Sequence, residues 1–94
     1  MTKRDAYIEA MKAQLDELNA RMSALETKTR RVKDDVRDKY EEEMRNLRHQ
    51  SKIAVAKLDE LKAAGEESWD NMVAEMEKVR DAFKHSFNYF KSQL

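Results

Sequence analysis

The sequence has no cysteine and no proline, and its single glycine is Gly65. Without cysteine the chain can form no disulfide bond, no zinc–thiolate site and no thiol nucleophile. Proline and glycine usually mark the ends of strands and the turns of multi-loop folds, so their scarcity excludes a β-rich fold.

The chain also lacks an excess of charge of either sign. Its 19 basic residues balance 19 acidic ones, so there is no long-range positive field of the kind that a dedicated nucleic-acid binder needs. A small basic cluster spans residues 28–33, but two aspartates follow it directly. We therefore expect no specific nucleic-acid partner.

Long apolar runs are absent as well. Charged residues interrupt residues 1–13, so this stretch has no signal-peptide apolar region, and no segment approaches transmembrane length. We expect a cytoplasmic location.

The residues that are present favour helices. Apolar and charged residues each make up 40% of the chain, which is enough apolar side chain for a narrow stripe rather than a wrapped interior. The abundant Ala, Leu, Met, Glu, Lys, Arg and Gln lose little rotamer freedom in a helix. The composition predicts an elongated, all-α molecule.

A heptad seam begins near the start of the chain, where apolar or tolerant residues recur in alternating steps of three and four. Its members are Ile8, Met11, Leu15, Leu18, Met22, Leu25, Thr29, Val32 and Val36. Such spacing is typical of a coiled-coil helix. Two four-residue steps then lead through Tyr40 to Met44, a stutter through which we expect the helix to continue.

The pattern breaks at residues 62–68. Lys62 suits a helix carboxyl end, Gly65 can take the left-handed conformation after it, and Glu66 suits a new amino end. We predict one coiled-coil unit over residues 1–94, with a helix over about 4–62, a turn over about 63–67 and a helix over about 68–92. One uninterrupted helix with a skip residue remains an alternative.

The two predicted helices form a long hairpin with a shared core. The first helix contributes Tyr40, Met44, Leu47, Leu58 and Leu61, and the second contributes Trp69, Met72, Met76, Val79, Phe83, Phe87 and Phe90. The second helix is too short to cover the heptad seam from Ile8 to Val32. We therefore predict self-association as an antiparallel homodimer, with a three-helix bundle at each end. A tetramer, or another helical protein as partner, stays open.

The segments AYIEAMKAQLDELNA, KYEEEM and KLDELKAAGEESWDNM resemble a group of small bacterial proteins that are usually described as coiled-coil-domain or hypothetical proteins. The most distinctive part is LKAAGEESW, residues 61–69. The resemblance implies a coiled-coil fold and supplies no catalytic or binding residues. The chain also resembles the amphipathic repeats of apolipoproteins, more weakly.

No catalytic, cofactor or metal site is expected. A di-iron helix bundle needs Glu-x-x-His, but Asn46 precedes His49 by three residues and Ala82 precedes His85 by three. Asp81 lies one turn before His85, where a surface hydrogen bond is the simpler interpretation. We expect no enzyme.

Five of the aromatic residues lie within the last 26 residues, where Phe83, Phe87 and Phe90 share one face. Large rings favour a bundle interior, although Lys84 and Lys91 beside them leave a membrane-binding face as the alternative. We predict a non-catalytic structural, scaffolding or protein-interaction module that acts through self-association. Reversible membrane-surface binding is the first alternative, and a metal-binding or stress-related role the second.

Overall fold

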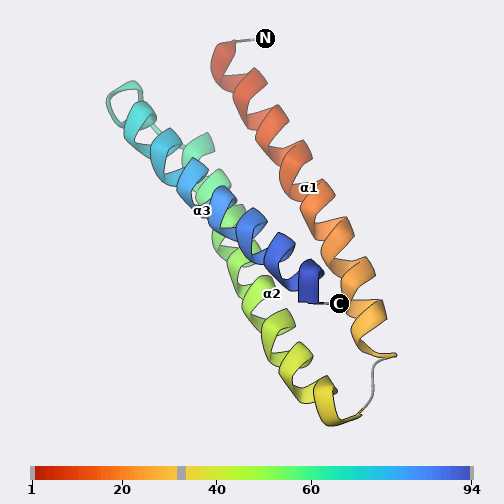
Figure 1. Ribbon diagram of the computed structural model, residues 1–94. Helices are drawn as coiled ribbons and strands as arrows, with labels where there is room; N and C mark the ends of the chain where they lie inside the picture. Colours follow the sequence, from red (N-terminus) through yellow and green to blue (C-terminus); the bar gives the residue numbers. More distant parts are fainter. Residues whose placement is uncertain (1, 32–33, 94) are drawn as a thin grey trace.

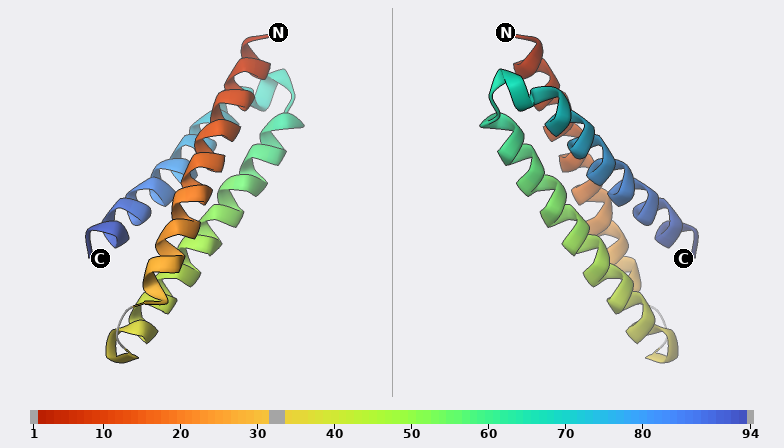
Figure 2. Two further views of the ribbon diagram at one scale, coloured as in Figure 1. Left: turned by 90° about the vertical axis from the view of Figure 1, so that its right-hand side faces the viewer. Right: turned by 90° about the vertical axis from the view of Figure 1, so that its left-hand side faces the viewer.

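The computed structural model describes residues 2–31 and 34–93, and within these ranges the chain forms three long helices (Figure 1). They are α1 (Lys3–Thr29), α2 (Asp34–Lys62) and α3 (Glu66–Gln93). The helices pack together in a rod of 51 × 20 × 18 Å. α1 and α3 both run antiparallel to α2, and α3 diverges from α2 toward its carboxyl end (Figure 2). The all-α bundle predicted from the sequence is confirmed.

A capping box opens α1. The Thr2 hydroxyl accepts a hydrogen bond from the Asp5 backbone N–H at 3.1 Å, and the Asp5 carboxylate accepts one from the Thr2 N–H at 3.5 Å. These bonds satisfy two backbone donors that a helix start otherwise leaves without partners. The helix consequently begins one residue before the predicted boundary.

The prediction of one continuous helix over residues 4–62 is wrong, because the chain reverses between Thr29 and Asp34. The reversal lets the heptad seam of α1 pack against α2 and α3 of its own chain, so burial rather than a local breaker ends the helix. The α-helical bonding pattern reaches Arg30, whose N–H donates to the Glu26 carbonyl at 3.3 Å, and Arg31 then makes a three-residue bond to the Lys28 carbonyl at 3.1 Å.

A turn joins α2 to α3 at the predicted place, but Gly65 is not left-handed there, as no described residue has a positive φ. The last turn of α2 tightens instead. Ala63 N–H donates to the Glu60 carbonyl at 3.1 Å, and Ala64 N–H donates to the Leu61 carbonyl at 3.2 Å. These three-residue steps satisfy the terminal carbonyls without a left-handed residue.

One continuous apolar core runs along the rod and draws on all three helices. Its buried members are Met11, Leu15, Leu18, Met22, Leu25, Met44, Leu47, Ala54, Leu58, Leu61, Met76, Phe83, Phe87 and Phe90. Tyr7, Ile8, Tyr40, Trp69, Met72, Val73 and Val79 are partly buried against it. The phenylalanine rings of α3 therefore lie in the interior of a three-helix bundle.

The heptad seam of α1 is buried inside one chain from Met11 to Thr29. A second chain was predicted because the seam had no partner within its own chain. In the structure α2 and α3 of the same chain provide that partner. Val36 is the exception, with 37% of its surface exposed. The predicted seam residue Val32 lies outside the described residues.

Candidate interaction surface

Aromatic and cationic side chains fix the amino end of α1 to the start of α3. The Arg4 guanidinium lies 4.4 Å from the ring centre of Trp69, and the Tyr7 ring meets the same indole edge to face at 5.8 Å. Arg4 also donates a hydrogen bond to the carbonyl of Ala64, just beyond the end of α2. Arg4 thus links the start of α1 both to α3 and to the turn between α2 and α3.

The Tyr7 hydroxyl donates a hydrogen bond to the Glu77 carboxylate at 3.4 Å. Burial of the phenol, together with the nearby negative charge of Glu77, raises the pKa of Tyr7 above its usual value. The tyrosine therefore remains a neutral hydrogen-bond donor throughout the physiological pH range.

A polar pair interrupts the apolar contact between α1 and α2 near its middle. The hydroxyl of Ser51, which is 8% exposed, donates a hydrogen bond to the side-chain carbonyl of Asn19. Because Ser51 is buried, a slip of register would leave its hydroxyl without this partner, so the pair disfavours other registers.

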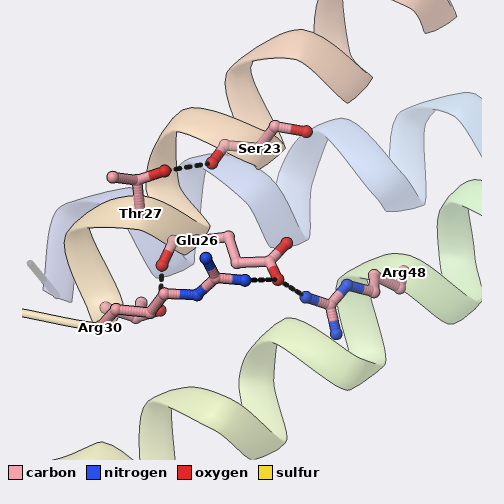
Figure 3. A network of polar contacts seen from close by, with 6 residues as sticks. Ser23, Glu26, Thr27, Arg30 and Arg48 are labelled. Atoms are coloured by element: carbon pink, nitrogen blue, oxygen red, sulfur yellow. Dashed lines mark hydrogen bonds and ion pairs between the residues drawn. The ribbon is translucent and has the colours of Figure 1, made fainter.

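Glu26 holds the far end of α1 against α2 (Figure 3). Its carboxylate accepts from Arg30 of the same chain segment at 3.2 Å and forms an ion pair with Arg48 of α2. The hydrogen bond from Arg48 is the main cause that lowers the pKa of Glu26 below its usual value. Thr29 adds a bond from its hydroxyl to the Glu26 backbone carbonyl at 2.7 Å.

A surface cavity of about 320 Å³ lies beside this network. Arg45 and Glu41 of α2 line it, together with Met44 and the residues of the Glu26 network. The carboxylates in its wall offset much of the arginine charge, so we treat it as part of the α1–α2 contact rather than as an anion site.

An ion pair near one end and an aromatic contact near the other join α2 to α3. Lys57 donates hydrogen bonds to Glu60 at 3.1 Å and to Glu75 of α3 at 3.0 Å, and these bonds raise the pKa of Lys57, that with Glu75 most. At the opposite end, the Tyr40 ring packs edge to face on Phe90 at 5.7 Å, and its hydroxyl donates to the Gln93 carbonyl at 3.1 Å.

Two neighbouring hollows lie between α1 and α3, and together we name them the cationic groove. The first, of about 180 Å³, is lined by Gln14, Glu17, Leu18, Arg21, Arg80 and Lys84. The second, of about 350 Å³, is lined by Arg21, Ala24, Leu25, Lys28, Phe87 and Lys91. Arg21 lines both hollows, so they form one surface.

The cationic groove gathers positive charge on a chain whose net charge is zero. Its lining holds five cationic side chains and the single carboxylate of Glu17. Glu17 is engaged by Arg21, while Arg80 is engaged by Asp81 at 2.9 Å and by Gln14 at 3.2 Å. Lys28, Lys84 and Lys91 form no ion pair with any other described residue, which leaves three uncompensated cations along the groove, Lys84 at the first hollow and the other two at the second.

Neither histidine lies in these contacts. His49 and His85 are both exposed, and His85 lines a separate hollow with Glu43 and Tyr89. The part of the chain that the structure describes contains no group of three histidine or carboxylate side chains placed to hold a metal ion. Of the helices in that part, none has the length and apolar character needed to cross a membrane.

Comparison of the chain with models of protein families, with curated proteins and with solved structures finds no match. The resemblance to small bacterial coiled-coil proteins therefore stays an expectation from the sequence. The function must be inferred from the contacts of the chain itself.

The structure brings the predicted hairpin-core residues together, either buried or partly buried, and places Gly65 in the turn. It also reveals polar contacts between α1 and α2 that sequence reasoning missed, namely Asn19 with Ser51 and Glu26 with Arg48. The seven-residue spacing of the groove cations, Arg21 with Lys28 and Lys84 with Lys91, was visible in the sequence. Its meaning depended on α1 and α3 being neighbours within one chain, which the prediction of a single helix over residues 4–62 had excluded.

Proposed function

We propose that the protein is a non-catalytic helical interaction module that self-associates by exchanging α1 between two chains. In the exchanged dimer, α1 and α2 of one chain join into one helix, and α1 packs on α2 and α3 of the other chain. Every contact described for α1 is then kept, but it is made between chains. Such exchange is a low-cost route to a dimer because the monomer already contains the interface.

The continuity of the helix up to the reversal is the observation that carries this proposal. Arg30 has helical dihedral angles (φ −69°, ψ −17°) and its N–H makes the four-residue bond of an α-helix to the Glu26 carbonyl, while Arg31 makes a three-residue bond to that of Lys28. The next two residues, Val32 and Lys33, are neither glycine nor proline. A straight helix over residues 3–62, about 90 Å long, therefore meets no conformational obstacle in this sequence.

The exposure of Val36 supports the same arrangement. Paired positions in two identical antiparallel helices lie at equal distances from the symmetry axis. The sequence midpoint of the contact between Asn19 and Ser51 is position 35, and that of the contact between Glu26 and Arg48 is position 37. The axis of the exchanged dimer would therefore pass close to Val36 and bring the two copies of this valine together, which gives an apolar partner to the one seam residue that is exposed among those the structure describes.

Cross-linking between chains tests the exchange directly, because the protein has no cysteine of its own. A chain with Glu26→Cys is mixed with a chain carrying Arg48→Cys, and both are unfolded and refolded together before a short bismaleimide is added. Each chain keeps the other member of the ion pair, so the mixed dimer retains one intact Glu26–Arg48 contact. We expect a covalent product of twice 11.1 kDa.

The matched control pairs Arg48→Cys with Asp16→Cys, which lies on the exposed surface of α1. Equal product from this control would show random collision and overturn the exchange. So would light scattering that finds a single chain at every concentration. A dimer by mass without the specific cross-link would place self-association on another surface and also overturn the proposal.

A further inference from the structure

The walls of the cationic groove repeat every seven residues on both sides. Arg21 and Lys28 stand on α1, and Lys84 and Lys91 stand on α3. Arg21 and Lys84 line one hollow, while Lys28 and Lys91 line the next. α1 and α3 run in the same direction (Figure 2), so the seven-residue steps on the two walls lead from the first hollow to the second.

We infer that the cationic groove binds an acidic amphipathic helix of a partner protein, which would lie between α1 and α3 as the fourth helix of the bundle. In coiled coils, charged residues at seven-residue spacing beside the seam select a partner helix whose opposite charges repeat at the same spacing. Two such rows of cations would recognise a helix with acidic residues along both edges of its contact face.

The uncompensated lysines give this site its charge complementarity. Lys28 and Lys91 line the second hollow, which has no carboxylate among its lining residues, and Lys84 lines the first, where the one carboxylate, Glu17, is already paired with Arg21. Like charges held close together repel one another, and an anionic partner would relieve that repulsion. Ala24, Leu25 and Phe87 form the floor, and the aliphatic stems of the lysines extend its apolar surface.

The regular spacing favours a helix over a lipid surface or a nucleic acid. Lipid headgroups have no fixed seven-residue register, and the groove is a concave strip between two helices rather than a flat face. The groove is rebuilt from two chains when α1 is exchanged, so this inference does not depend on the dimer.

Binding of a synthetic helical peptide tests the inference. The probe is a labelled peptide of about three heptads with alanine and leucine at its seam positions and glutamate beside them. Fluorescence anisotropy with the full chain should show saturable binding that weakens as salt is added. In the variant Lys84→Glu/Lys91→Glu, the dissociation constant should rise at least about tenfold.

Lys39→Glu/Lys52→Glu is the matched control, since these lysines are exposed on α2 outside the groove. It makes the same change in net charge and should alter the dissociation constant less than about twofold. Equal weakening by both double variants would overturn the groove as the site. Equal binding of an acidic peptide with scrambled heptads, or binding of anionic vesicles but not of the peptide, would overturn the helix as its occupant.

Discussion

Glu26 makes the ion pair that joins the far end of α1 to α2. Its carboxylate is 25% exposed and receives two guanidinium groups, one from the end of its own helix and one from α2. The Arg30 contact is local and would survive in an isolated helix, whereas the Arg48 contact exists only when α1 is docked. The ion pair with Arg48 therefore couples the protonation of Glu26 to the packing of α1 on α2.

Removing the charge of Glu26 should destabilise the protein at neutral pH but not in acid. The lowered pKa means that Glu26 stabilises the fold fully above its ordinary value of 4.5, and that this stabilisation is lost as the pH falls through the folded-state pKa. Glu26→Gln should lower the free energy of unfolding by about 0.5–1 kcal/mol near neutral pH. Urea denaturation at a series of pH values from about 7 to about 3 should show that the difference in unfolding free energy between wild type and Glu26→Gln shrinks once the pH falls below the ordinary glutamate pKa.

Glu17→Gln is the control for this titration. Among the described residues, Glu17 makes an ion pair only with Arg21 on its own helix, and this pair is exposed, so its loss should change the free energy of unfolding by no more than about 0.5 kcal/mol. A constant difference between wild type and Glu26→Gln across the whole pH range would contradict the assigned role of the ion pair.

At the scale of the helices, the two connections show what a sequence can reveal. The α2–α3 turn was predictable because Lys62, Gly65 and Glu66 change the local helix preference there. The α1–α2 reversal was not, because Arg30, Arg31 and their neighbours favour a helix and the heptad seam continues across them. Only the packing of α1 against the α2–α3 hairpin selects the reversal, and packing between distant segments leaves no local signal.

The α2–α3 turn should become more stable without its glycine. Gly65 has no positive φ, and a Cβ atom built there meets no atom within 4 Å. Gly65→Ala should therefore raise the free energy of unfolding by about 0.4–1 kcal/mol, because alanine reduces the conformational freedom of the unfolded chain. Urea denaturation followed by circular dichroism measures the change.

The reverse exchange at a neighbouring position provides the control. Ala63 is exposed in the same turn, so Ala63→Gly should lower the free energy of unfolding by a similar amount. Destabilisation by Gly65→Ala would mean that the turn needs a backbone conformation that only glycine adopts readily.

For the molecule as a whole, the same heptad seam can be buried in two ways. The seam from Met11 to Thr29 packs on the α2–α3 hairpin within one chain, and the exchanged dimer would use the same contacts between chains. A heptad pattern predicts which residues are buried, but it does not indicate whether the helix that covers them belongs to the same chain or to another. The sequence therefore predicted the buried residues well, while the partner of α1 and the groove that this partner creates required the folded structure.

Val36 distinguishes the two arrangements because it has different neighbours in each. In the single chain it is 37% exposed near the start of α2, where an added carboxylate costs little. In the exchanged dimer, Val36→Glu would set two like charges against each other near the symmetry axis and remove an apolar contact. We expect the dimer dissociation constant to rise at least about tenfold in sedimentation experiments, with the free energy of unfolding of the monomer changed by less than about 0.5 kcal/mol.

Val55→Glu is the matched control, since Val55 lies on the same helix with 42% of its surface exposed. Equal weakening by both substitutions, or a Val36→Glu chain that dimerises as tightly as the wild type, would refute the placement of Val36 at the axis and with it the exchange of α1.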